Sequence, residues 1–584
     1  MGREKVTFSE FFRVQAAVFR ELFTKYRAKS AVLAFLSFVT ITSSLIELKF
    51  VEYITNAVTG YFEGTVAFSS LLITVSLFLG SLLLITVLSN LQQKITLRYQ
   101  SDIGFDVGCK ITKKLSEIPY EYYEFSSFHD KINHAREASE AYSQAVWGST
   151  VIISTVLRVA VYGTLLSRIS PLYLLVITVA IVISVIISSK VTEKRMINKY
   201  KNLSPNDRRS AYFGCIMSDR VNHQNIQTTR NYPFFSNTYG KFNELTRKAG
   251  VKENLMSFAS EGAVVLMFAA SFFVTVIVVG RGVAQGSFTL GYFTMVTALL
   301  ADLFWNVRDF SFVVINHTGY AKAVGAYYEI MEIDSAGEGE NGEGDGSVSV
   351  KDLRYKYPQS ERYALNGITL SFQKGEKVAV VGHNGSGKTT MMAIIARLLR
   401  SYEGELHEEG AVVSAVMQDF VHYQMTVKES IELGCGGREL PEEKIFEILK
   451  KVELYDFIMS KPKGIDTNLG QLEEDGVELS KGQYQRLAIA RLLANEDSNV
   501  WILDEPTAFL DPIAEIETYK HIFDLAGDRL VFFISHRLGF AKHADRIIVT
   551  EDGRIVEDGS HSELIARKDS VYKRMFESQK EWFE

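Results

Sequence analysis

Long apolar runs alternate with charged stretches through the first half of the chain. Six of these runs are long enough to cross a membrane as helices, because about 30 Å of hydrocarbon takes roughly 20 apolar residues. They cover about 30–58, 66–93, 146–167, 171–191, 255–280 and 288–316. Farther along the chain the pattern changes to short buried-strand runs followed by helical ones, which is typical of an α/β domain.

The loops between these runs differ sharply in charge. Those after the second and fourth runs, about 94–145 and 192–254, are long and rich in Lys and Arg, as is the stretch before the first run. The loops on the other side are short and nearly uncharged. Cytoplasmic loops carry the excess of Lys and Arg. We therefore expect the N-terminus, both long loops and the C-terminal half to be cytoplasmic, which six spans allow.

These patterns divide the chain into four parts. Residues 1–29 form an N-terminal segment whose 8–26 stretch is interpreted as a helix along the membrane surface, the alternative being an ordinary cytoplasmic helix. Residues 30–333 form the membrane domain, 334–347 an acidic, Gly-rich linker, and 348–584 the C-terminal domain.

Composition supports a membrane protein. The 584 residues are 47% hydrophobic, with a mean hydropathy of +0.04, which is too apolar for an ordinary soluble enzyme of this size. The net charge of −6 gives no basic field, so nucleic acid is not an expected partner. The three cysteines show no paired or metal-ligand spacing, and the N-terminus does not resemble a cleaved signal or transit peptide.

Each long loop contains an aromatic cluster. The first spans Tyr120–Phe128, and the second is Tyr232-Pro233-Phe234-Phe235 followed by Tyr239. Exposed aromatic residues at the tips of charged helices predict docking surfaces for the C-terminal domain. Ordinary packing between helices explains the pattern equally well.

Several predicted spans contain charged residues, which cost about 2.5 to 3.5 kcal/mol each at mid-membrane. They are Glu47, Lys49, Glu52, Arg158, Glu261, Asp302, Arg308 and Asp309. Such groups should face one another or a watery cavity. Arg308 and Asp309 are interpreted as residues at the cytoplasmic end of the sixth span, whereas Glu47, Arg158 and Asp302 are the candidates for a substrate pathway.

A phosphate-binding loop follows the strand pattern at 378–381 and precedes a helical pattern at 391–399. It reads Gly382-His383-Asn384-Gly385-Ser386-Gly387-Lys388-Thr389. Glycine lets the backbone approach closely, and successive N–H groups then surround the anion at the start of a helix. In this arrangement Lys388 reaches the β- and γ-phosphates of ATP, and the Thr389 hydroxyl coordinates Mg²⁺.

Two further strand patterns end in polar residues that suit phosphate chemistry. The first, 500–503, is followed by Asp504 and Glu505. Asp504 suits Mg²⁺ binding, and Glu505 is placed to orient or deprotonate the attacking water. The second, 530–534, is followed by Ser535 and His536, and we expect the His536 ring to contact the γ-phosphate. Glu505 and His536 are the predicted catalytic residues.

With these motifs in place, residues 348–584 resemble the nucleotide-binding domain of an ABC transporter, and the whole chain resembles an exporter-type half-transporter. The resemblance implies a six-helix α-helical transmembrane domain followed by an α/β P-loop ATPase domain. It also implies that Tyr357 stacks on adenine, although strand packing explains an aromatic residue there too. Gln418 matches the loop that touches Mg²⁺, and Asp511 matches a further ATP-site loop.

The segment Leu479-Ser480-Lys481-Gly482-Gln483 is similar to the signature sequence of that family, which in relatives completes the ATP site of the opposing subunit. Lys481 stands where glycine is usual. The ATP-binding residues implied altogether are Tyr357, Gly382, His383, Asn384, Gly385, Ser386, Gly387, Lys388, Thr389, Thr390, Gln418, Ser480, Gly482, Gln483 and Asp511, with Thr389, Gln418 and Asp504 holding Mg²⁺. We expect a homodimer, the alternative being a pair with a homologous half-transporter.

The resemblance implies an ATP hydrolase that exports a substrate by alternating access across a bacterial plasma membrane. The spans are rich in aromatic residues and contain several charged ones, which favours an amphipathic substrate. We expect a peptide, including modified peptides and bacteriocins. A lipid flippase or multidrug exporter would share every motif above. A sensor in which ATP turnover gates signalling is an alternative of another class. Besides substrate and a second subunit, membrane lipid is the expected partner.

Overall fold

The computed structural model describes residues 8–167, isolated positions between 178 and 198, and 204–335, 344, 346–358, 360–505, 512–535 and 538–579. The chain divides into two compact units. One comprises residues 1–117 and 129–334, and the other comprises residues 118–128 and 335–584.

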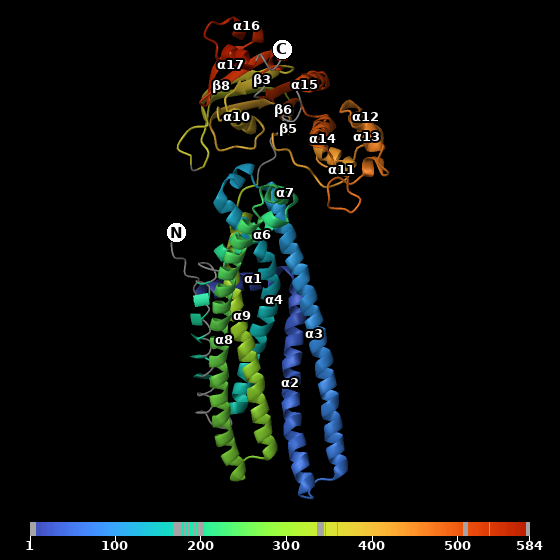
Figure 1. The fold of residues 1–584 in the computed structure, drawn as a ribbon. Helices are drawn as coiled ribbons and strands as arrows, with labels where there is room; N and C mark the ends of the chain where they lie inside the picture. The colour runs from blue at the N-terminus through green and yellow to red at the C-terminus, as the bar shows by residue number, and fades with distance from the viewer. Residues whose placement is uncertain are drawn as a thin grey trace. The chain divides into compact units, whose positions relative to one another are not determined.

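The first unit is helical (Figure 1). Its helices are α1 (Phe8–Lys25), α2 (Arg27–Phe62), α3 (Phe68–Glu117), α4 (Ser126–Ser167), α6 (Ser204–Ser218), α7 (Arg220–Thr229), α8 (Tyr232–Ala284) and α9 (Leu290–Met331). At 1.5 Å per residue, α3 with 50 residues and α8 with 53 are about 75 to 80 Å long. That is more than twice the thickness of the hydrocarbon core, so both helices extend well beyond it.

Five helices in the described part of the chain are long and apolar enough to cross a membrane: α2, α3, α4, α8 and the first part of α9. They coincide with five of the six apolar runs in the sequence, and the run at 171–191 lies outside the described residues except for isolated positions. The apolar span of α3 is unburied within the chain, as a surface facing lipid requires.

Part of one face of helix α1 packs against other helices of the first unit. Val18 and Leu22 are buried in a cluster with Tyr99 of α3 and Tyr142 of α4. At the end of α1, the Tyr26 hydroxyl donates to the Asp106 carboxylate at 2.6 Å. The helix therefore has almost the predicted bounds, and part of its apolar face contacts protein.

The second unit contains two sheets. Its strands are β1 (Ser347–Tyr355), β2 (Leu365–Phe372), β3 (Lys377–Gly382), β4 (Glu403–Glu409), β5 (Val413–Val416), β6 (Val500–Asp504), β7 (Leu530–Ile534), β8 (Arg546–Glu551) and β9 (Arg554–Gly559). A three-stranded antiparallel sheet has the order β2-β1-β4, and a six-stranded sheet has the order β5-β6-β7-β3-β8-β9. In the larger sheet only β9 is antiparallel to its neighbour.

Strands β6 and β7 are buried along their whole length. Parallel strands covered on both faces have near-continuous apolar sequences, which is why the pattern in the sequence locates them correctly. The carboxyl ends of β3, β6 and β7 lie at one edge of the sheet, where ligands bind in open α/β sheets.

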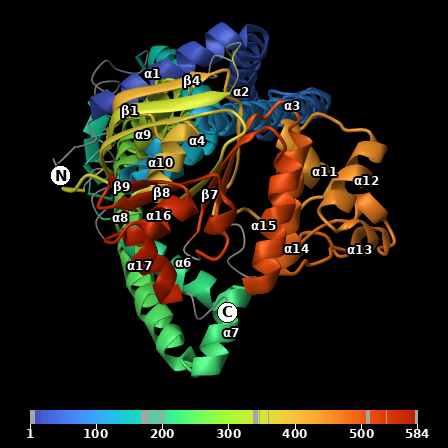
Figure 2. The ribbon, with the colours of Figure 1, turned by 90° about the horizontal axis from the view of Figure 1, so that it is seen from above.

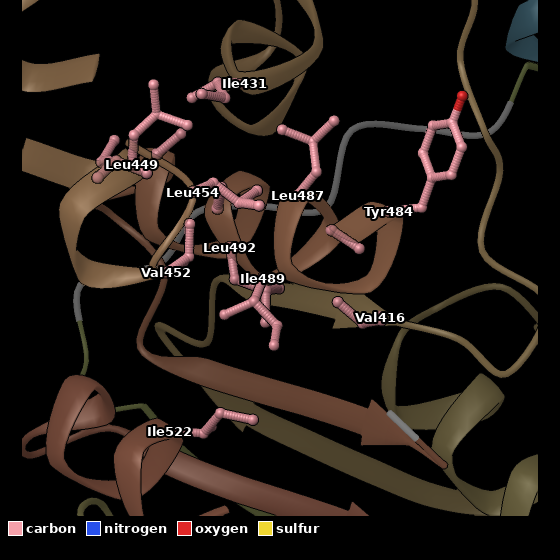
Figure 3. Close-up of a cluster of buried hydrophobic side chains, with 14 of the residues drawn as sticks. Val416, Ile431, Leu449, Val452, Leu454, Tyr484, Leu487, Ile489, Leu492 and Ile522 are labelled. Carbon is pink, nitrogen blue, oxygen red and sulfur yellow. The ribbon is translucent and has the colours of Figure 1, made fainter. Parts of the chain in front are cut away.

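Helices surround these sheets. They are α10 (Lys388–Ile395), α11 (Val427–Glu432), α12 (Glu442–Lys451), α13 (Tyr455–Met459), α14 (Lys481–Ala494), α15 (Pro512–Ala526), α16 (His561–Ala566) and α17 (Val571–Gln579), with 3₁₀ turns η1 (Tyr120–Glu124), η3 (Leu433–Cys435), η4 (Gly464–Asp466) and η5 (Ala541–His543). Helices α11 to α14 lie together beside the larger sheet (Figure 2). Figure 3 shows their core, where Leu449, Leu454, Leu487 and Leu492 belong to one buried cluster.

The turn η1 belongs to the second unit although it precedes α4 in the chain. The Glu121 carboxylate accepts hydrogen bonds from the backbone N–H groups of Arg400 and Ser401, at 3.1 and 3.0 Å, and from the Ser401 hydroxyl at 2.9 Å. These bonds hold the turn within the second unit, next to the residues that precede β4. The second cluster opens α8, where the Phe235 ring packs against that of Phe213 in α6.

Candidate functional site: the nucleotide site

The loop between β3 and α10 curves through glycines in the left-handed region. Gly385 has φ +77° and Gly387, which caps α10, has φ +102°. A Cβ on Gly387 would lie 2.6 Å from the carbonyl oxygen of Ala364. Both the backbone conformation and the close approach therefore require glycine at this position.

We expect Gly387→Ala to reduce ATP affinity at least tenfold, because the added methyl group must displace the backbone at Ala364 or distort the loop. Gly385→Ala is the matched control. That glycine also has a positive φ, but a Cβ there would meet nothing within 4 Å. Equilibrium binding of a fluorescent ATP analogue measures both variants. Equal losses in the two would show that backbone conformation alone, and not the contact with Ala364, determines the effect.

Lys388 lies at the start of α10 with only 5% of its surface exposed. Its ammonium group donates to the carbonyl oxygens of Gly382 at 2.9 Å and His383 at 3.0 Å. Burial lowers the pKa of Lys388, against the opposing attraction of Glu505 and Asp504. A buried ammonium group at the start of a helix that follows a glycine-rich loop is chemically suited to bind a polyphosphate.

The next residue joins the loop to the end of β6. The Thr389 hydroxyl donates to the Asp504 carboxylate at 2.8 Å, and Asp504 is 1% exposed. A hydroxyl and a carboxylate oxygen together are the kind of ligands that Mg²⁺ takes in phosphate-binding sites. The residues therefore fit a Mg²⁺ ion that accompanies ATP.

Glu505 follows β6 in the left-handed region, with φ +49°. Its backbone N–H donates to the carbonyl oxygen of Ile534 at 3.0 Å, which ties it to the end of β7. Burial raises the pKa of Glu505, partly offset by the positive charge of Lys388. A carboxylate with a raised pKa is a better proton acceptor, as a general base requires.

Tyr357 lies close to the same loop. Its hydroxyl is 3.1 Å from that of Thr390, and its ring contacts the ring of Tyr355 edge-on, with centroids 5.1 Å apart. This position beside α10 suits contact with adenine, and the packing on Tyr355 is what the alternative interpretation expects.

Of three other predicted site residues, the structure describes only Gln418. The Gln418 side chain is exposed on the loop after β5 and makes no hydrogen bond within the described residues. Asp511 and His536 lie outside the described residues. Ser535, directly before His536, is buried at the end of β7.

The signature-like segment begins α14. Ser480 caps the helix by accepting from the backbone N–H of Gln483 at 3.2 Å, and the Gln483 side chain accepts from the backbone N–H of Ser480 at 2.9 Å. Ser480 and Lys481 are exposed and Gly482 is half-buried. The Gln483 side chain thus has a structural task in the capping box, which Ser followed three residues later by Gln could have indicated from sequence.

In the membrane domain the structure brings two of the three predicted pathway residues together. An Arg158 guanidinium nitrogen (Nη1) lies 2.8 and 3.0 Å from the two carboxylate oxygens of Asp302. The Tyr162 hydroxyl donates to Asp302 at 2.5 Å, and the Asn306 amide donates to the Asp302 carbonyl oxygen at 2.7 Å. Tyr162 and Asn306 were not predicted from the sequence, although each stands one helical turn after a charged residue.

Glu47, on α2, lies close enough to Asp302 for their two carboxyl groups to interact. Within the described residues Glu47 has neither an ion pair nor a hydrogen bond. In contrast, Glu52, five residues farther along α2, pairs with Lys49 at 2.6 Å. Counted as ionised groups, Arg158, Asp302 and Glu47 together have one negative charge in excess.

A P-loop ATPase domain fused to a bundle of membrane-spanning helices defines an ATP-driven membrane transporter. The ABC transporter family model matches residues 365–508. The subtilin transport ATP-binding protein SpaT of Bacillus subtilis is 30% identical over 535 residues, which cover 87% of this chain and 86% of that protein. The chain belongs to the ABC transporter family and has the exporter-type arrangement of a half-transporter.

Other relatives differ in how much of the chain they match and at what identity. The nisin transport ATP-binding protein NisT of Lactococcus lactis is 37% identical over 249 residues, covering 40% of this chain and 41% of that protein. An ATP-dependent lipid A-core flippase of Francisella tularensis is 29% identical over 84% of this chain and 81% of its own length. A bacterial Atm1-family ABC exporter solved with ATP bound has the same fold, with TM-score 0.82, 20% identity, and coverage of 96% of this chain and 99% of that one. The protein is thus a multi-pass membrane protein that binds and hydrolyses ATP to drive export.

Proposed function

We propose that this chain exports an amphipathic peptide across a bacterial plasma membrane as a homodimer. The observation that carries the proposal is the similarity along most of both chains to a subtilin transport protein. The negatively charged cluster in the membrane domain adds support, because a peptide with basic side chains is attracted to an unpaired carboxylate such as that of Glu47.

In this proposal each ATP site is built from two chains. Lys388 and the backbone of its loop bind the phosphates, and Thr389, Asp504 and Gln418 hold Mg²⁺, which supplies charge neutralisation for the transferred phosphoryl group. Glu505 orients the attacking water and accepts its proton, and His536 contacts the γ-phosphate. Ser480 and Gly482 of the opposite chain complete the site, for which their place at the exposed start of α14 is suitable.

The same proposal places the two termini, the long loops and the ATPase domain in the cytoplasm. Closure of the two ATPase domains around ATP would turn the substrate cavity outward, and hydrolysis would reset it. ATP drives this change only as far as it binds the closed state more tightly than the open one. Contacts that Ser480 makes only in the closed dimer supply that difference.

Transport into inside-out vesicles containing only this protein tests the proposal. We expect ATP-dependent uptake of a cationic amphipathic peptide, lost when Glu505→Gln replaces the wild type. No uptake of the peptide, together with translocation of a fluorescent phospholipid, would contradict peptide export and favour the flippase suggested by the lipid A-core relative. Absence of any ATP hydrolysis by the chain alone would contradict the homodimer.

We expect Glu47→Gln to lower uptake of the cationic peptide about tenfold, since the substitution removes a carboxyl group that has no ion-pair partner within the described residues. Uptake of the same peptide with acetylated lysines should change little. Glu52→Gln is the matched control, because Glu52 lies on the same helix and already pairs with Lys49. If the wild type and the Glu47 variant take up the cationic peptide at the same rate, and the acetylated peptide at the same rate, Glu47 does not select substrate charge.

A further inference from the structure

The loop after β5, which carries Gln418, continues along one face of α14. The His422 ring stacks on that of Tyr484, with centroids 3.9 Å apart and an interplanar angle of 6°. The Arg491 guanidinium lies 5.1 Å from the Tyr423 ring centroid. Tyr484 and Arg491 are seven positions apart, which is about two helical turns, so both contacts use the same side of α14.

The stack lies one turn from the signature residue. The backbone N–H of Tyr484 donates to the carbonyl oxygen of Ser480 at 3.0 Å. Tyr484 is only 4% exposed and stands at the edge of the hydrophobic core of this helical region (Figure 3). His422 is exposed and covers the Tyr484 ring. This contact therefore joins the loop to the first turn of α14.

A third contact fastens the same loop to the segment before α14. The backbone N–H of Gln471 donates to the Gln424 side-chain oxygen at 3.2 Å. His422, Tyr423 and Gln424 thus make consecutive contacts with the segment from 471 to 491. These contacts join the loop that carries Gln418 to the start of α14.

We propose that His422 is a positioning residue for ATP hydrolysis, which by stacking on Tyr484 holds Ser480 in a fixed place relative to Gln418. The inference rests on the proposed function, in which Gln418 serves the Mg²⁺ site of its own chain and Ser480 serves the ATP site of the opposite chain. His422 then links the two ATP sites of the dimer through one side-chain contact.

The charges around His422 favour its neutral form. Although the residue is exposed as a whole, partial burial of its ring lowers the pKa of His422, and the positive charges of Arg491 and Lys481 act in the same direction against the attraction of Glu478. Because the pKa of His422 in the folded protein lies below its ordinary value of about 6.5, the free energy of the stack is fully available above that pH. It is lost as the pH falls through the lowered value, when the protonated ring is repelled by Arg491 and Lys481.

Steady-state ATP hydrolysis by the full-length protein in lipid vesicles tests the inference. We expect His422→Ala to lower kcat roughly two- to tenfold, with the Kd for a fluorescent ATP analogue unchanged within about twofold. His422→Phe keeps the stack and should retain kcat, and it should also remove the part of the activity loss below pH 6.5 that His422 causes. His407→Ala, at an exposed position of β4, is the control.

Three results would overturn the inference: wild-type kcat in the Ala variant, a Phe variant as slow as the Ala variant, or equal loss of activity and ATP affinity. Hydrogen exchange provides a readout that needs no turnover and no dimer. We expect His422→Ala to speed exchange in both 418–424 and 480–484. His422→Phe and His407→Ala should leave exchange in both segments unchanged. Faster exchange in the loop alone would refute the link to α14 even if the chain proved inactive by itself.

Discussion

Replacement of Glu505 by glutamine is expected to lower the rate of ATP hydrolysis at least 100-fold while ATP binding persists. Glutamine keeps the size of the side chain but cannot accept a proton from the attacking water, and general base catalysis contributes about 10² to 10⁴ in rate. Lys388, Thr389 and the glycine-rich loop, which bind the phosphates, are unchanged. Phosphate release and binding of a fluorescent ATP analogue, both measured in lipid vesicles, check the two parts of the prediction.

Glu551→Gln is the matched control. Glu551 ends β8 of the same sheet as Glu505 ends β6, but it is exposed. We expect its hydrolysis rate to stay within about twofold of wild type, as for surface substitutions in general. If Glu505→Gln hydrolyses ATP at more than a tenth of the wild-type rate, Glu505 is not the general base.

The second large effect is expected on stability. Arg158→Met should lower the free energy of unfolding by roughly 3 to 5 kcal/mol, because it leaves the Asp302 carboxylate without its counter-ion inside the membrane domain. The side chain of Arg158 is only 13% exposed and that of Asp302 32%, so water replaces little of the lost interaction. Thermal unfolding in detergent, followed by the loss of monodisperse protein, measures the change.

Removing both charges tests the physical reason. The double variant Arg158→Met, Asp302→Leu should recover most of the lost stability, since buried ion pairs can often be replaced by apolar side chains at little cost. Arg308→Met is the control, because Arg308 is exposed and its ion pair with Asp309, at 3.6 Å, should contribute no more than about 1 kcal/mol. If the double variant is no more stable than Arg158→Met, the arginine acts through packing instead of charge.

The sequence predicted best what is contiguous along the chain. The phosphate-binding loop, its strand and its helix occupy neighbouring positions, and the strands at 500–504 and 530–534 are buried apolar runs of the length that a parallel sheet requires. Five apolar runs correspond to long helices for the same reason, since the thickness of a bilayer fixes their minimum length.

The sequence could not predict which distant side chains meet. That Arg158 and Asp302 should face another charge followed from the cost of isolated charges in a membrane, but the choice of partner, 144 positions away, depends on how α4 and α9 pack. The stack of His422 on Tyr484 depends on the path of a loop without regular structure, for which no periodic pattern exists. The bonds from Glu121 to Arg400 and Ser401 join segments that are far apart in the chain. From sequence position alone, Glu121 would be assigned to the first unit, and Arg400 and Ser401 to the second.

Those bonds have a consequence for synthesis of the protein. Ser401 follows Glu121 by 280 positions, so at about 5 to 20 residues per second the ribosome needs roughly 15 to 60 seconds to produce the partner of Glu121. During that interval the aromatic turn Tyr120–Glu124 exists without the surface that it contacts in the finished chain. This part of the second unit can therefore be completed only after Arg400 and Ser401 have been synthesised.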